Sequence, residues 1–117
     1  MEKFILLKKS HKLALNVYKI TQSFPEEEVY GLTSQIRRSA VSIPSNIVEG
    51  KARKSKNEYE RFLLISRGSL EELSYQMLLS RDLGYISDKE YDEFLNLSIE
   101  VGKLLNGVIN SLKNKSV

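Results

Sequence analysis

The sequence contains no cysteine, one histidine and two prolines in 117 residues. Without cysteine the chain can form neither a disulfide framework nor a thiolate metal site, which agrees with a reducing cytoplasm. The single histidine, His11, excludes the carboxylate-bridged metal site of ferritin-like bundles, because that site needs two Glu-x-x-His pairs. A Ser-His-acid triad would have to bring His11 to Ser42 or Ser45, and nothing in the spacing indicates it. We therefore expect a protein that is not an enzyme and uses no metal or cofactor.

Long hydrophobic runs are also missing at the start of the chain. The apolar run there has only four residues, Phe4 to Leu7, which is too short for the core of a signal peptide or for a membrane span. We therefore expect a soluble, unprocessed, cytoplasmic protein that does not contact a membrane. The length fits one folding unit, so the predicted domain spans residues 1–117.

The scarcity of proline and glycine, together with the absence of strand-like alternation, predicts an all-α protein. Capping signals of the S-x-x-E type occur at Ser55 with Glu58 and at Ser87 with Glu90. Gly31 closes an acidic turn and is expected to take a left-handed conformation. The predicted helices run from about residue 8 to 22, from residue 32 or 33 to near 50, from 55 to about 83, and from 87 onward.

The fourth predicted helix has the clearest periodicity. Its apolar seam follows alternating steps of three and four residues through Tyr91, Phe94, Ser98, Val101, Leu105, Val108 and Leu112. Short connections make neighbouring helices antiparallel, so the sequence predicts an up-down-up-down four-helix bundle. Further apolar residues lie beside the seam at Leu95, Leu97, Ile99, Leu104 and Ile109. They indicate either a homo-oligomer that buries them or a helix in the crowded centre of a monomer.

The second predicted helix contains Pro44, which removes a backbone hydrogen bond. We expect the neighbouring Ser42, Ser45 and Asn46 to serve the freed backbone groups. Ser39 and Ala40 are small enough to let another helix approach closely. A single side of this helix carries Arg37, Val41, Pro44 and Val48. If Arg37 is buried it needs a carboxylate, and Glu49 and Glu72 are the candidate partners.

Positive charge is concentrated in the middle of the chain. Residues 34–67 include eight basic and three acidic residues, a balance of +5, whereas the rest of the chain is net −2. The predicted nucleic-acid-binding residues are Arg37, Arg38, Lys51, Arg53, Lys54 and Lys56. Only Tyr59 adds an aromatic ring to this segment, so contacts to the RNA or DNA backbone are favoured over base stacking. The alternative is that the arginines pair with acids and solvate the domain.

Several motifs together point to a family. The stretches YGLTSQIRRSAVSIPSNIVEG from Tyr30, ERFL from Glu60 and GSLEEL from Gly68 resemble proteins encoded in intervening sequences of bacterial 23S rRNA genes. The same family includes the accessory variability determinant of diversity-generating retroelements. The matching positions are Tyr30, Gly31, Leu32, Gln35, Arg37, Arg38, Ser42, Pro44, Asn46, Glu49, Gly50, Arg61, Phe62, Gly68, Ser69 and Glu72. Among them, Pro44, Asn46, Glu49, Gly50 and Glu72 are interpreted as structural.

The resemblance implies an antiparallel bundle that assembles into a ring, typically a homopentamer, with a basic surface that engages nucleic acid and no known catalytic activity. It also leaves open an adaptor that holds a protein partner, because the retroelement accessory protein is thought to hold a reverse transcriptase. One position departs from the family. Relatives often carry an aromatic residue, commonly tryptophan, where this chain has Lys8 and Lys9.

Overall fold

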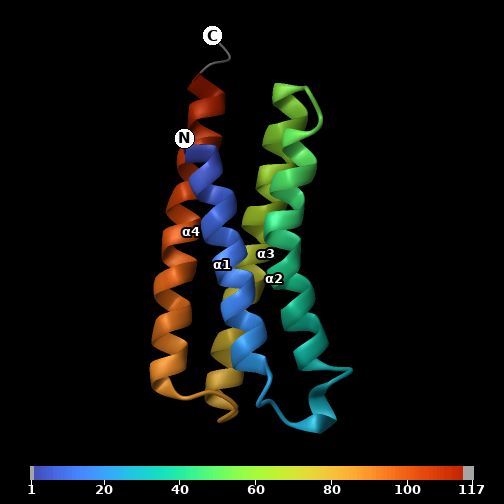
Figure 1. Cartoon of the computed structure of the whole chain (residues 1–117), viewed down its shortest axis with the longest axis vertical. Coiled ribbons are helices and arrows are strands. Elements are labelled where there is room, and N and C mark those ends of the chain that lie inside the picture. The colour runs from blue at the N-terminus through green and yellow to red at the C-terminus, as the bar shows by residue number, and fades with distance from the viewer. Residues whose placement is uncertain (1, 115–117) are drawn as a thin grey trace.

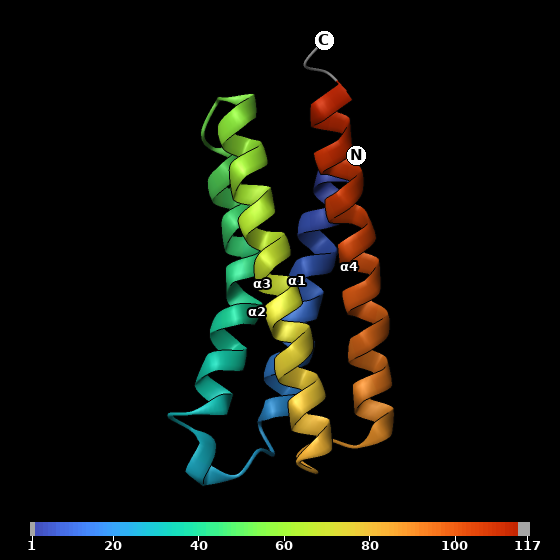
Figure 2. The same cartoon turned by 180° about the vertical axis from the view of Figure 1, so that it is seen from behind.

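Four long antiparallel helices form the computed structural model, which describes residues 2–114 (Figure 1, Figure 2). Each helix packs against its neighbour in the chain, and α4 returns to lie beside α1. The predicted all-α, up-down-up-down four-helix bundle is therefore confirmed. The helices are α1 (Glu2–Thr21), α2 (Leu32–Lys51), α3 (Lys56–Asp82) and α4 (Asp88–Asn114), with a short 3-10 turn, η1 (Glu26–Glu28), between α1 and α2.

The first helix begins earlier than predicted. The expected start was about Lys8, but α1 begins at Glu2 and includes the apolar run of residues 4–7. Leu6 and Ser10 are fully buried and extend the buried stripe of Leu13 and Val17 toward the N-terminus. The seven-residue interval from Leu6 to Leu13 was the sequence signal for this extension, because residues two turns apart share a helix face.

The complete capping box predicted from Ser87 and Glu90 forms at the start of α4. The backbone N–H of Glu90 donates to Ser87 Oγ at 3.1 Å, and the Ser87 N–H donates to Glu90 Oε1 at 3.0 Å. Only half of the corresponding box forms at α3. There the Glu58 N–H donates to Ser55 Oγ at 3.3 Å, but the Glu58 carboxylate accepts from Arg61 at 3.0 Å instead of reaching back. The charged guanidinium is the stronger partner for the carboxylate.

The start of α2 has a cap that the sequence did not reveal. Gly31 was expected to be left-handed, but its φ is −114°. The first turn is instead capped by Glu28, whose Oε1 accepts from the Leu32 N–H at 3.1 Å. The other oxygen of Glu28 accepts from the Tyr85 hydroxyl at 2.8 Å, and this hydrogen bond raises the pKa of Tyr85. Gly84, beside Tyr85, takes the left-handed conformation with φ +82° and ends α3.

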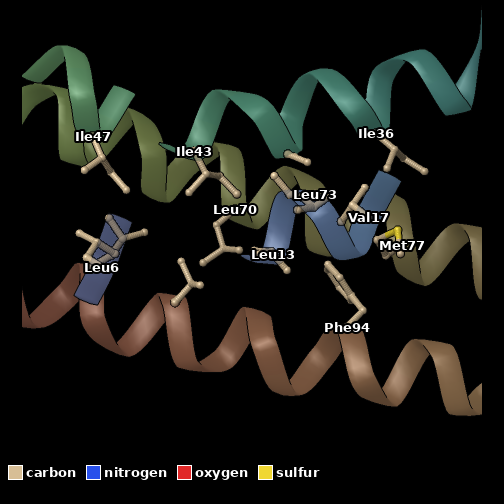
Figure 3. Packing of buried hydrophobic residues seen from close by; sticks show 14 of the residues in the cluster. Leu6, Leu13, Val17, Ile36, Ile43, Ile47, Leu70, Leu73, Met77 and Phe94 are labelled. Carbon is tan, nitrogen blue, oxygen red and sulfur yellow. The ribbon is translucent and has the colours of Figure 1, made fainter. Parts of the chain in front are cut away.

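The core fills the space between all four helices, and Figure 3 shows its side chains pointing toward one another from each of them. The α4 seam is buried from Phe94 to Leu112, as predicted. The apolar residues beside the seam mostly belong to the same core: Ile109 is 1 % exposed, and Leu97 and Leu104 pack against it. Ile99 alone of these large side chains is about half exposed, at 49 %. Most of the additional apolar surface of α4 is therefore buried within the monomer. This agrees with the alternative that α4 lies in the crowded centre of a monomer.

Helix α2 continues unbroken through Pro44, as expected. The Asn46 amide donates to the Ser42 carbonyl at 2.8 Å, and the Ser66 hydroxyl of α3 donates to the Ile43 carbonyl at 2.8 Å. Small polar side chains thus bind carbonyls next to the proline, but neither is the Ala40 carbonyl, which the missing N–H of Pro44 frees, and the Ser42 hydroxyl is hydrogen-bonded to Ser69 instead. Ser39 and Ala40 are buried against α3, in agreement with the predicted close approach of a second helix.

Candidate functional site

Antiparallel packing separates the charges of the chain along the bundle. The α2–α3 connection lies at the same end as the N-terminus of α1 and the C-terminus of α4 (Figure 1). Among the described residues this end carries Lys113 in the last turn of α4 and five further cations, which we call the basic end: Lys3, Lys51, Arg53, Lys54 and Lys56. The opposite end carries the acids of η1 and of the α3–α4 connection: Glu26, Glu27, Glu28, Asp82, Asp88, Glu90, Asp92 and Glu93. The helix bundle thus has one positive and one negative end.

The six residues predicted to bind nucleic acid do not form one surface. Lys51, Arg53, Lys54 and Lys56 lie together at the basic end. Arg37 and Arg38 lie about four turns earlier on α2, roughly 20 Å away at the rise of an α-helix. Both line one groove on α2, but Arg37 also reaches α1 whereas Arg38 also lines a polar groove against α3. The six residues were grouped because they are close together in the sequence. Within a helix, however, residues that are close in sequence differ in their position along the axis and in the direction of their side chains.

Arg37 makes structural contacts within the monomer. Its Nε donates to Thr21 Oγ1 at 2.9 Å and its Nη2 to the Tyr18 carbonyl at 3.4 Å. The guanidinium carbon also lies 4.6 Å from the centroid of the Tyr18 ring. The two candidate carboxylates are engaged elsewhere: Glu49 is 3.7 Å from Arg53, and Glu72 accepts from Ser39 at 3.1 Å. The predicted partner of Arg37 was therefore wrong, and a hydroxyl, a carbonyl and a ring of α1 take its place.

The lysines of the basic end are available to a ligand. Among the described residues, Lys51, Lys54 and Lys56 form no ion pair. Lys54 also has a left-handed backbone with φ 39°, a conformation that costs a residue with a side chain about 1 kcal/mol. Arg53 differs, because it pairs with Glu49 and lies 5.1 Å from the centroid of the Phe62 ring.

Sequence reasoning missed Lys3. The residue belongs to the first turn of α1, 48 positions before Lys51, yet its Nζ lies 5.5 Å from the centroid of the Tyr59 ring on α3. The signal that could have found it was the predicted topology itself, since an up-down-up-down bundle brings the start of α1 beside the α2–α3 connection.

An apolar groove of about 850 Å³ lies between α1 and α2. Phe4 and Leu7 of α1 line it together with Pro44 and Val48 of α2, and Phe4 and Val48 are 65 % and 54 % exposed. His11, the one histidine, is exposed at its edge. Pro44 therefore also contributes to an exposed apolar surface. The side of α2 that was predicted to carry Arg37, Pro44 and Val48 together is the side that faces α1.

The described part of the chain contains neither a metal cluster nor a membrane-spanning helix. Residues 2–114 hold no group of three or more acidic or histidine side chains placed to bind a metal ion. Along the same residues, no helix combines the length and the apolar character that crossing a membrane requires.

The fold and these motifs define a family of small helical-bundle proteins. A family model described as 23S rRNA-intervening sequence protein matches residues 2–107, so the chain belongs to that family. A crystal structure of a protein of unknown function from the S23 ribosomal protein family of Bacteroides thetaiotaomicron is similar, with 27% identity and a TM-score of 0.86. The alignment covers 94% of this chain and 99% of that one. No curated protein matches the chain.

Proposed function

We propose that this protein is a non-catalytic, cytoplasmic nucleic-acid-binding protein whose basic end contacts the phosphate backbone of RNA or DNA. The observation that carries the proposal is the cluster of Lys51, Lys54 and Lys56, which form no ion pair among the described residues and are joined by Lys3 from α1. Clustered, solvated cations attract a polyanion and release its counterions without reading its sequence. Arg37 and Arg38 were among the residues predicted from the sequence to bind nucleic acid, but they are not part of this proposed interface.

The backbone of Lys54 supports the same function. A lysine at φ 39° occupies a position where glycine or asparagine would cost less. Strain of this kind is often retained at functional sites. Here the retained feature is a long cationic side chain at the tip of the α2–α3 connection.

The proposal is tested by fluorescence anisotropy with labelled single-stranded RNA and duplex DNA at about 50 and about 200 mM salt. We compare the double variant Lys51→Gln/Lys54→Gln with a matched control, Lys19→Gln/Lys89→Gln, which loses the same charge away from the basic end. If both lysines contact phosphates, the first variant binds about tenfold or more weakly at low salt, and its log–log salt slope falls by about 1.5 to 2.

The control variant separates a local contact from net charge. It should keep the wild-type salt slope and nearly the wild-type affinity. Equal weakening by both variants would show that only net charge matters, and no wild-type binding at the lower salt would refute nucleic-acid binding altogether.

We also propose that the chain forms a homo-oligomeric ring, with a pentamer as the size that the family resemblance implies. Two different apolar surfaces support a ring. The first is the α1–α2 groove, and the second is the outer face of α3, where Leu64, Ile65 and Tyr75 are 39 %, 41 % and 63 % exposed. They lie on different faces of the bundle, with α1 and α2 nearer in Figure 1 and α3 and α4 nearer in Figure 2. A contact between unlike surfaces is heterologous, and heterologous contacts form a ring when the rotation between copies closes and a filament when it does not.

The assembly is tested by analytical ultracentrifugation of the wild type, Val48→Glu and Ile99→Glu at micromolar concentration. Both variants place a carboxylate at an exposed apolar site, but only Val48 lines the α1–α2 groove. We expect an oligomeric wild type, a dissociated Val48→Glu and an oligomeric Ile99→Glu, because a desolvated charge opposes burial of the groove. Dissociation by Ile99→Glu alone would move the interface to α4, and a monomeric wild type would refute the ring.

A protein adaptor is the second candidate function, with a partner such as a reverse transcriptase. The exposed apolar groove between α1 and α2 favours this function, because such a groove accepts an amphipathic helix. A monomeric wild type that binds no nucleic acid would shift the proposal to this function, and a reverse transcriptase gene beside the gene for this protein would strengthen it.

A further inference from the structure

A groove of about 390 Å³ with a mostly polar accessible lining lies between α2 and α3. Its volume is in the lower part of the range of small-molecule sites, about 300 to 1,000 Å³. Polar residues of the two antiparallel helices form three pairs across it: Ser42 with Ser69, Ser39 with Glu72, and Gln35 with Gln76. The first two pairs are hydrogen-bonded, at 2.8 and 3.1 Å, whereas the third pair, one helical turn further along, is not.

Gln76 lines this groove with an amide that has no hydrogen-bond partner. The residue is 6 % exposed, and its Oε1 is shut off from solvent without a partner among the described residues. Its Nε2 has no partner there either, but it is not shut off, so it is the amide atom that reaches the groove. Buried side-chain amides usually have partners, because leaving them unpaired costs their solvation. A turn of the amide exchanges its oxygen and nitrogen, so Gln76 is able to present a donor or an acceptor.

Two opposite charges line the same groove without pairing with each other. Arg38 forms no hydrogen bond, ion pair or ring contact among the described residues. Glu72 accepts from Ser39 through Oε1, and its Oε2 has no partner in the described part of the chain. The guanidinium and the second carboxylate oxygen are therefore both available to a ligand that lies between them.

One positive and one negative charge select a ligand that carries both signs. A nucleic-acid phosphate would be repelled by Glu72, and the lysines of the basic end lie roughly 20 Å away along α2. A free α-amino acid has a carboxylate and an ammonium group on one carbon atom. Internal residues of a peptide lack both of these backbone charges, so the groove fits the free amino acid better than a peptide segment.

We propose that this groove binds a free α-amino acid whose side chain ends in an amide. Arg38 donates to the ligand carboxylate, and Glu72 Oε2 accepts from the ligand ammonium group. The ligand side chain lies toward Gln35 and Gln76, because the other polar pairs already have hydrogen bonds. An amide, which both donates and accepts, complements the amides of these two residues. The inference is independent of nucleic-acid binding, since none of these residues belongs to the basic end.

The test is a calorimetric titration of the wild type with L-glutamine and L-asparagine up to millimolar concentrations. Three analogues of glutamine each remove one group: N-acetylglutamine the ammonium, the α-amide of glutamine the carboxylate, and leucine the side-chain amide. Loss of either charge should weaken binding about tenfold or more, and leucine should bind about two- to tenfold more weakly than glutamine. Failure of both amino acids to bind, or equal binding of all the analogues, would overturn the inference.

Variants of the two charges locate the ligand in the groove. Arg38→Ala and Glu72→Gln should each bind glutamine about tenfold or more weakly. Glu72→Gln keeps an oxygen that accepts from Ser39, so the contact between α2 and α3 is retained. The matched control is Glu71→Gln, because Glu71 is the preceding exposed acid on α3 and does not line the groove. This control should keep the wild-type affinity, and equal weakening by Glu71→Gln would overturn the site.

Thermal unfolding of Gln76→Leu separates binding from folding. This change removes a buried amide that has no partner among the described residues, so the melting temperature should equal or exceed that of the wild type. Glutamine should raise the melting temperature of the wild type more than that of Gln76→Leu. A strongly destabilised Gln76→Leu would overturn the inference, because the amide would then have a structural role. Loss of RNA binding by Arg38→Ala and Glu72→Gln would also overturn it, since the groove would then belong to a nucleic-acid interface.

Discussion

Substitution of Gly50 by valine is expected to lower the free energy of unfolding by about 2 to 3 kcal/mol, the usual cost of overpacking a well-packed contact. Gly50 lies at a close approach of α2 to α3. A Cβ at this position would lie 2.6 Å from Phe62 Cβ and 3.2 Å from Tyr59 Cδ1. Phe62 Cβ is attached directly to the α3 backbone, so a rotamer change does not relieve the clash. Chemical denaturation followed by circular dichroism measures the loss.

Alanine scanning at two glycines provides the control. Gly50→Ala should destabilise the protein, whereas Gly68→Ala on exposed α3 should stabilise it by about 0.5 to 1 kcal/mol, the intrinsic preference of a helix for alanine. A Cβ at Gly68 would meet nothing within 4 Å. The same change thus has opposite signs at the two sites. A stabilising Gly50→Ala would show that the helices are farther apart than the structure places them.

Substitution of Arg37 by alanine is expected to lower the free energy of unfolding by about 2 kcal/mol, because it removes charged hydrogen bonds that join α2 to α1. Loss of the contact with the Tyr18 ring adds to this cost. Arg38→Ala is the control on the next residue. Arg38 is exposed in a polar groove, so its removal should change stability by no more than about 0.5 kcal/mol.

Nucleic-acid affinity gives the second readout for this pair. Neither arginine belongs to the basic end, so both variants should retain nearly the wild-type affinity. If Arg37→Ala instead kept its stability and lost affinity, Arg37 would be a phosphate ligand, as its place in the basic segment predicted.

The residues interpreted as structural have separate physical roles in the bundle. Gly50 permits the close approach of α2 and α3, and Glu72 of α3 accepts from Ser39 of α2. Asn46 binds the backbone beside Pro44, and Glu49 pairs with Arg53 at the end of the helix. Most of these contacts involve α2.

The sequence by itself determined the helices, their order and the core. Periodicity and capping are local, so the seam from Phe94 to Leu112 and the box of Ser87 and Glu90 could be predicted from neighbouring residues in the chain. The start of α1 differs from the prediction because the apolar run of residues 4–7 continues the buried stripe of the helix through Leu6. Short connections between antiparallel helices then left few possible topologies.

Only the tertiary structure decided which residues meet. It placed Lys3 beside Tyr59, joined Glu28 to Tyr85 and moved Arg37 from the predicted binding surface to a contact with α1. These contacts depend on the rotation of each helix about its axis and on its offset along its neighbour. Packing of all four helices sets both quantities together, and no local pattern in the sequence records them.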